Sequence, residues 1–389
     1  MHGLPGWNRA ITVGLAMGAV LLAILATLVV LDVTLAAGHQ SPIAGDPPQY
    51  DAISAAILDG AVPYRDVPVE HLPGSLIPMV AVGLLSRVTE LSFETLWPFA
   101  MGIAFVAAVA MADSFPTLTN GGRRFLLLSL PLLPLVLFRV EPWLILWVVA
   151  SLGFAFGSSW GRSSIAAAIA AMTKGWPLIL LTIPFRLGRR QLAATVAVLT
   201  VLALAFVALL PGFREGRAFE GIHTETIIGN LVLVYRDVFG SDLQLIGVAG
   251  AEYVSVGQWA VALNMLIGLP LLAVAIRNVL RQDTVVELIP SIGLGVLGII
   301  LASPLFSSQF LFWLVPFVLL LVAGRQLTFS VVAVMTLLTI ILWNPWTAGW
   351  NLLVLARNAL LLLFAVMWAF DAVSHPPDSA EDSLLEDIA

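Results

Sequence analysis

The stretch Ser163–Phe185, SSIAAAIAAMTKGWPLILLTIPF, has the length of a membrane span but contains residues that interrupt one. Its 23 residues are almost all apolar, and Arg162 and Arg186 flank it. A helix needs about 20 apolar residues to cross a ~30 Å hydrocarbon core. Lys174 and Pro177 stand near the middle, so the pattern predicts two half-helices with both arginine-bearing ends on the cytoplasmic side. A single straight span is the alternative.

Similar apolar runs recur from residue 11 to residue 370, at about 11–36, 75–88, 94–113, 125–138, 142–158, 191–211, 259–277, 287–303, 309–323, 327–343 and 353–370. The 389-residue chain is 60% hydrophobic and only 11% charged, and its mean hydropathy is +0.99. Soluble domains carry about 25% charged residues, so this composition excludes a soluble enzyme. The runs are too long and too uniform for an outer-membrane barrel. We therefore predict an all-α polytopic membrane protein with about ten to twelve transmembrane helices, forming one domain over residues 1–372.

Two polar segments interrupt the apolar runs, at about residues 37–74 and 212–258, and we predict that both are external loops. The first loop should carry short interfacial helices, one of them at Tyr50–Leu58. The acidic tail 373–389 has no apolar face and is predicted to be disordered. The net charge of −6 gives no support for nucleic acid as a partner. The absence of cysteine excludes disulfides and thiolate metal sites.

Ionisable residues inside apolar runs are candidates for function, because a charge at membrane depth needs a partner or a cavity. Lys174 is the only lysine of the chain, and it could bind a lipid-linked phosphate as a point charge. Alternatively it forms a structural ion pair, or its ammonium reaches the interface. Arg139 and Glu141 lie in a short polar break, FRVEPW, and could equally be an ordinary interfacial pair.

The first loop combines carboxylates with aromatic rings, which suits a sugar site. Carboxylates bind hydroxyl groups and act as general bases, while rings stack on sugar faces. A solvated surface would explain any one of these residues taken alone. The candidates are Asp46, Tyr50, Asp51, Tyr64, Arg65, Asp66 and Glu70.

Polar residues also gather in the second loop and near the C-terminus. The second loop contributes Arg217, His223 and Glu225, and the C-terminal part contributes Gln309, Arg357 and Asn358. These last residues could be helix caps or interfacial anchors, or they could project into a shared cavity. No metal site is predicted, because no further histidine lies at ligand spacing from His223. There is no Walker loop and no nucleotide fingerprint.

Seven short motifs, in order over most of the chain, resemble glycosyltransferase family 87, the polyprenyl-phosphate-mannose-dependent mannosyltransferases of the GT-C superfamily. They are Asp46 with Tyr50; Gly60 with Pro63-Tyr64-Arg65-Asp66 and Glu70-His71-Leu72-Pro73; Arg139-Val140-Glu141; Lys174 with Pro177; Arg217 with Glu225-Thr226; Ser307-Ser308-Gln309-Phe310 with Trp313 and Pro316; and Arg357-Asn358. The chain departs from the family pattern at Glu141, where the family has Asp, at His71-Leu72, where it has aromatic-Pro, and at Ser308, where it has Pro.

The resemblance implies a GT-C-like bundle that transfers a sugar, mannose by family default, from a polyprenyl phosphate to a glycolipid or cell-envelope glycan. It implies that Asp46 is the general base and that Lys174, Arg217 and Arg357 are the cations available to the leaving phosphate. The other candidates above would bind substrate. No cofactor is assigned, although a divalent cation could assist.

The alanine- and arginine-rich composition with a single lysine indicates a bacterial protein, and we expect a monomer. The resemblance implies an enzyme of the plasma membrane with its active site on the external face. Two other hypotheses stay open. One is a transporter or flippase for a lipid-linked sugar, for which the sequence shows no internal repeat. The other is an inactive relative that serves as a scaffold.

Overall fold

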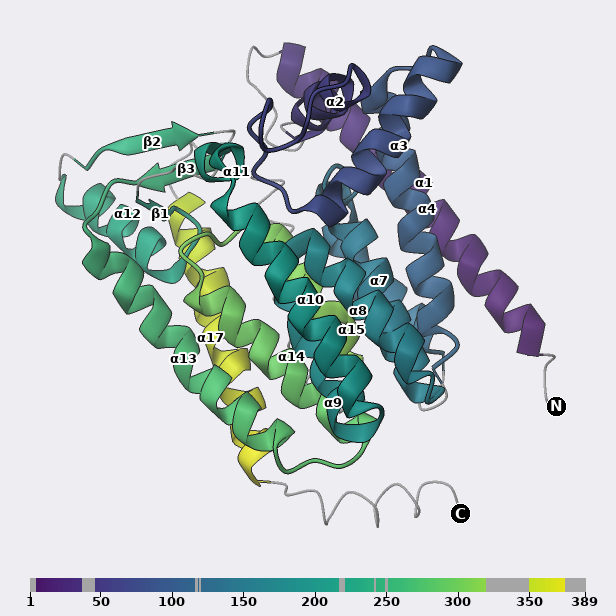
Figure 1. Cartoon of the computed structure of the whole chain (residues 1–389). Coiled ribbons are helices and arrows are strands. Elements are labelled where there is room, and N and C mark those ends of the chain that lie inside the picture. The colour runs from purple at the N-terminus through teal and green to yellow at the C-terminus, as the bar shows by residue number, and fades with distance from the viewer. Residues whose placement is uncertain are drawn as a thin grey trace. The chain divides into compact units, whose positions relative to one another are not determined.

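We describe a computed structural model of the chain (Figure 1), in which residues 5–36, 46–115, 118, 120–216, 221–240, 243–248, 251–319 and 350–374 are described. These residues are predominantly helical and form two compact units, Met1–Phe219 and Glu220–Ala389, which we call unit 1 and unit 2. The prediction of a helical membrane protein is confirmed at this level, because several helices are long and apolar enough to cross a bilayer. The prediction of a single domain over residues 1–372 stays a prediction.

Unit 1 consists of helices whose ends follow from proline, glycine and capping residues. Proline stands at the start of α3, and the Ser92 side chain caps α4 by accepting from the Thr95 amide at 3.2 Å. The elements are α1 (Pro5–Ala36), α2 (Asp46–Leu58), α3 (Pro73–Thr89), α4 (Phe93–Ala112), α5 (Gly121–Ser129), η1 (Leu130–Leu132), α6 (Leu133–Val136), α7 (Glu141–Phe156), α8 (Trp160–Lys174), η2 (Trp176–Leu181), α9 (Thr182–Leu187), α10 (Arg190–Leu209) and α11 (Pro211–Gly216).

The break that the sequence predicts near Lys174 is present. Helix α8 ends at Lys174, and Gly175 follows with φ +74°, a conformation that favours glycine. The chain then folds back through η2 and α9. This brings Gly188, which follows α9, against Trp160 at the start of α8, so close that a Cβ added at Gly188 would lie 2.4 Å from Cγ of Trp160. This segment is therefore a hairpin with both arginine-bearing ends at one end of it, and the straight-span alternative is wrong.

Helix α2 confirms a helix in the first loop, but its packing differs from that of a helix lying on a membrane surface. It packs against α3 and α4 (Figure 1). Its buried residues include Tyr50, Ile53 and Ser54, and it exposes no large hydrophobic side chain. The helix forms one wall of a polar cluster in unit 1, because its first turn carries Asp46 and Tyr50.

Unit 2 contains a small antiparallel sheet that the sequence did not predict. Its strand order is β1-β3-β2, with Ile222 opposite Val254 and Leu245 also opposite Val254. The elements are β1 (Ile222–His223), α12 (Ile227–Phe239), β2 (Leu245–Val248), β3 (Ala251–Val254), α13 (Gln258–Val279), α14 (Val285–Ala302), η3 (Ser308–Leu314), α15 (Val315–Val318) and α17 (Trp350–Ser374). The second loop is thus a structured element, not a plain polar connection.

Among the described residues, five helices are long and apolar enough to span a bilayer: α4, α10, α13, α14 and residues 351–370 of α17. Shorter apolar helices of 10–17 residues lie at Ile11–Thr27, Pro73–Thr89, Glu141–Phe156, Trp176–Leu187 and Ser308–Val318. The predicted span at about 327–343, the first nine residues of the first loop and the tail after Ser374 lie outside the described residues.

Candidate functional site

Asp46 is the first residue of α2, and unit 1 engages both of its carboxylate oxygens. The Tyr50 hydroxyl, one helical turn later, donates to Oδ2 at 2.8 Å. Oδ1 forms an ion pair with Nη1 of Arg139, a residue from the short break before α7. Asp46 and Arg139 are both largely but not completely buried. The carboxylate is therefore held in one orientation while part of it still reaches solvent.

Tyr50 is buried and is packed between two other rings. Its ring centroid lies 5.2 Å from that of His71, edge-on, and 4.8 Å from that of Trp97. Burial raises the pKa of Tyr50 well above 10.0, and the charges of Glu141 and Glu70 raise it further. The phenol therefore stays protonated and donates to Asp46. A ring enclosed in this way cannot stack on a sugar, so the predicted substrate contact of Tyr50 is not supported by its position.

Glu70 and Tyr64 lie at the end of the first loop, close to Tyr50. Nε2 of Gln49 donates to Oε1 of Glu70 at 3.3 Å, and Nε2 of His71 lies 3.5 Å from the same oxygen. The Tyr64 hydroxyl donates to the His71 carbonyl at 2.7 Å, and the Tyr64 carbonyl accepts from the Gly212 amide at 3.0 Å. These bonds fix the loop and connect it to α11.

Lys174 pairs with Glu141, as the structural reading of this lysine predicts. Nζ of Lys174 lies 3.7 Å from Oε1 of Glu141, whose side chain is only 1% exposed. A buried carboxylate needs such a counter-charge. Helix ends add to the effect, because Asp46 and Glu141 each begin a helix and Lys174 ends one, so each charge lies at the favourable pole of its helix dipole.

Close contacts between backbone segments hold the hairpin tip against the end of the first loop. Oγ of Ser75 donates to the Thr173 carbonyl at 3.0 Å, and Nε1 of Trp143 donates to the Gly74 carbonyl at 3.1 Å. A Cβ at Gly74 would lie 2.7 Å from the Met172 carbonyl carbon. Only glycine permits this approach, which brings Lys174 to Glu141.

Three predicted residues of the first loop lie away from this cluster. Arg65 and Asp66 pair with each other on the surface at 2.7 Å, and hydrogen bonding from Arg65 lowers the pKa of Asp66 to about 2. Burial raises the pKa of Asp51, Glu94 raises it further, and Arg87 opposes them. Asp51 therefore faces α3 and α4, not Asp46. For these three residues the solvated-surface or packing reading fits better than sugar binding.

The second group of predicted residues forms a buried network in unit 2. Nη1 of Arg357 donates to Oε2 of Glu225 at 2.5 Å and to Oγ of Ser308 at 2.8 Å. Nη2 donates to the Glu225 carbonyl at 2.8 Å and to Oδ1 of Asn358 at 2.9 Å, and Nε donates to the same Oδ1 at 3.2 Å. The guanidinium also lies over the Phe306 ring, 4.8 Å from its centroid. All five donors of Arg357 are thus used within unit 2.

His223 lies beside this network. Its Nδ1 accepts from the Glu225 amide at 3.2 Å, so the neutral ring is held in one tautomer. Burial lowers the pKa of His223 below 6.5. Burial alone would raise the pKa of Glu225, but the Arg357 and His223 charges and the hydrogen bonds from Ser308 and Arg357 together outweigh it, so the net pKa lies below 4.5. Gln309 is buried in η3, next to Ser308.

Arg217, predicted as a phosphate ligand, lies outside the described residues. In the part of the chain that is described, no group of three or more His, Cys, Asp or Glu side chains is placed to hold a metal ion.

The three departures from the family pattern each make a contact in the structure. Glu141 pairs with Lys174, and His71 packs against Tyr50 beside Glu70. Oγ of Ser308 donates to Oε2 of Glu225 at 2.5 Å, a bond that a proline could not make. The candidate residues named from the sequence do not include His71 and Trp97, which pack on Tyr50, or Gln49, which donates to Glu70. Position i+3 from Asp46 marks Gln49, but nothing in the local pattern marks Trp97.

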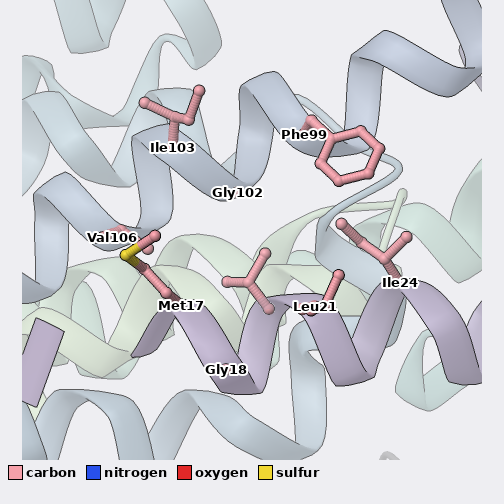
Figure 2. A pocket seen from close by; sticks show the side chains of 9 residues that line it. Met17, Gly18, Leu21, Ile24, Phe99, Gly102, Ile103 and Val106 are labelled. Atoms are coloured by element: carbon pink, nitrogen blue, oxygen red, sulfur yellow. The ribbon is translucent and has the colours of Figure 1, made fainter. Parts of the chain in front are cut away.

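An apolar groove runs between α1 and α4 in unit 1. It has a volume of about 400 Å³, and every lining residue is apolar or glycine: Met17, Gly18, Val20, Leu21, Ile24, Phe99, Gly102, Ile103 and Val106. Figure 2 shows Ile24 beside Phe99 at one end and Met17 beside Val106 at the other. Phe99 is two residues from Trp97, which packs on Tyr50. The Phe99 end of the groove is therefore the end nearer along α4 to Trp97 and its Tyr50 contact.

Comparison with protein-family models, with curated proteins and with solved structures returns no match for this chain.

Proposed function

We propose that this chain is a polyprenyl-phosphate-sugar-dependent glycosyltransferase of the GT-C type. It transfers a sugar, mannose by family default, to a glycolipid or cell-envelope glycan on the external face of a bacterial plasma membrane. The observation that carries the proposal is the Asp46 carboxylate, held by Tyr50 and Arg139 yet still partly open to solvent. A bundle of ten to twelve transmembrane helices and a monomeric state belong to the same proposal.

The chemistry is an inverting displacement. The Asp46 carboxylate takes the proton of the acceptor hydroxyl while that oxygen forms a bond to the anomeric carbon. The bond between the anomeric carbon and the phosphate oxygen breaks on the opposite side, and polyprenyl phosphate leaves with both electrons. Lys174, which pairs with Glu141 and not with Asp46, is the candidate cation for the leaving phosphate, while Arg139 holds the base in place.

Two observations support a lipid-linked donor. The groove between α1 and α4 is entirely apolar and gives an isoprenoid chain a place in unit 1. Its Phe99 end is the end nearer along α4 to Trp97, which packs on Tyr50, so a lipid in the groove could bring its head group toward Asp46. By contrast, the saturated donors of Arg357 make it a structural residue of unit 2 and a poor phosphate ligand without rearrangement.

The test is transfer of radiolabelled mannose from polyprenyl-phosphate mannose to an envelope glycolipid extract, with the protein in liposomes. The Asp46→Asn variant should lose about 10²–10⁴-fold in rate, the usual contribution of a general base. Asp59→Asn is the matched control, because the Asp59 carboxylate is exposed and pairs only with Arg87 at 2.7 Å in the described structure. It should keep wild-type transfer.

Wild-type turnover by Asp46→Asn would refute the assignment of the base. If the protein moves the labelled lipid across the bilayer without transferring its mannose, the proposed function is wrong and the protein is a transporter. Normal membrane insertion of both variants is the condition for either conclusion, and protease protection measures it.

A further inference from the structure

Helix α12 in the second loop presents an apolar face that none of the described residues of unit 2 covers. Leu231, Tyr235, Val238 and Phe239 share this face, because the spacing i, i+4, i+7, i+8 places residues on one side of a helix. Their side chains are 45–69% exposed. The Tyr235 and Phe239 rings lie together, with centroids 4.8 Å apart. We call these four residues the α12 outer face.

The ends of α12 are capped and its opposite side is packed, so the α12 outer face is exposed on a well-anchored helix. The Thr226 side chain caps the start by accepting from the Gly229 amide at 3.0 Å, and Gly240, with φ +68°, ends the helix. Ile228, Val232 and Leu233 pack toward the sheet.

The polar edge of α12 is tied to the start of α17. Asp237 accepts from Nδ2 of Asn351 at 2.5 Å, and Nδ2 of Asn230 donates to the Asn351 carbonyl at 3.2 Å. With its sheet side and its polar edge both engaged, α12 has one remaining side, and that side is the α12 outer face.

The neighbouring helix α13 indicates what covers this face. Helix α12 contacts α13, a candidate membrane span whose exposed side is also apolar, with Leu263, Leu266 and Leu269 44–60% exposed. Trp259, at the start of α13, is 56% exposed. Trp and Tyr concentrate at the membrane–water boundary, where an apolar ring can carry a polar edge.

We propose that α12 lies in the membrane–water interface, with the α12 outer face in contact with lipid. Its 13 residues make a helix of about 20 Å, too short to span a core of ~30 Å but suited to lying along its surface. Leu231, Val238 and Phe239 enter the acyl boundary, and the Tyr235 hydroxyl faces the head groups. The interfacial helix that the sequence placed in the first loop is thus found in the second.

The test uses single cysteines, because the natural chain has none. A nitroxide on Val238→Cys is compared in liposomes with one on Leu263→Cys, on the exposed side of α13, and one on Gln244→Cys, at an exposed polar position before β2. Molecular oxygen partitions into lipid, whereas a nickel chelate stays in water. The ratio of oxygen to nickel collisions at Val238 should match Leu263 and exceed Gln244 severalfold.

A ratio at Val238 equal to that at Gln244 would place α12 in water and overturn the proposal. Spin–spin broadening at Val238, absent at Leu263, would identify a second copy of the chain as the covering partner and would also overturn it. Neither result depends on sugar transfer, so the interfacial placement of α12 and the proposed enzymatic function are tested independently.

Discussion

A buried carboxylate decides what the single lysine does. Because the Glu141 side chain is 1% exposed and Lys174 lies 3.7 Å away, the lysine has the position of a counter-ion and not of one reaching for the interface. Removing one partner of a buried pair leaves an uncompensated charge and costs about 3–5 kcal/mol. The pair is connected to Asp46 by a short segment of chain, because Arg139, which pairs with Asp46, is two residues before Glu141.

We therefore expect Lys174→Leu and Lys174→Gln to lower both transfer and the melting temperature in detergent, with Lys174→Arg lowering them less. The double variant Lys174→Met/Glu141→Gln removes both charges and should recover much of the stability. If transfer stays low in that double variant, the charges also act on the substrate. Wild-type activity and stability in Lys174→Leu would contradict the counter-ion role.

At the scale of elements, the α8–η2–α9 hairpin predicts on which side of the membrane its two ends lie. Trp160 and Gly188 are in contact, so Arg162 and Arg189 belong to the same end of the hairpin. Membrane-impermeant thiol reagents should label Arg162→Cys and Arg189→Cys from the same side, the cytoplasmic one. Asp59→Cys, in the predicted external loop, is the control and should label from the opposite side. Labelling of the two arginine positions from opposite faces would reject the hairpin.

Sequence patterns predicted elements well where local chemistry defines them. The hairpin break follows from Lys174, Gly175 and Pro177, and most apolar runs became helices within a few residues of their predicted ends. The sheet was missed because its strands have only 2–4 residues, too few for an alternating pattern. Helix α12 was missed because its segment looked polar as a whole, although its caps Thr226 and Gly240 were visible in the sequence.

Partners are the part of the site that local patterns cannot supply. The sequence marks Asp46 and Lys174 singly and offers Arg139 with Glu141 as an interfacial pair, whereas the fold pairs Arg139 with Asp46 and Lys174 with Glu141. The family resemblance assigns Arg357 to the phosphate, whereas the fold shows that its donors already bind Glu225, Ser308 and Asn358. The solvated positions Arg65 and Asp66 looked equivalent to Asp46 in the sequence.

At the scale of the whole molecule, the stability of unit 2 should depend on pH. Burial lowers the pKa of His223 below 6.5, so the unfolded chain binds the proton more readily than the folded one. The stabilisation is complete above pH 6.5 and is lost as the pH falls toward the folded value. Glu225, whose folded pKa lies below 4.5, contributes stability that is lost in the same direction at lower pH.

The melting temperature of the detergent-solubilised protein should therefore fall on acidification from pH 6.5. In His223→Asn the amide oxygen can still accept from the Glu225 amide, but this position no longer titrates, so the melting temperature should fall less between pH 6.5 and 4.5 than in the natural protein. The two proteins are compared at pH 8 as a control. Parallel curves between pH 6.5 and 4.5 would show that His223 is not the responsible group.

The separation of bonded residues along the chain has a consequence for synthesis. Glu225 and Arg357 are separated by 132 positions, and Ser75 and Thr173 by 98. A ribosome adds about 5–20 residues each second, so each early partner waits on the order of 5–30 s for its late one. A chain that ends before residue 357 would lack Arg357, the partner of the Glu225 carboxylate. Premature termination near the end should therefore be recognised and degraded as readily as termination far upstream.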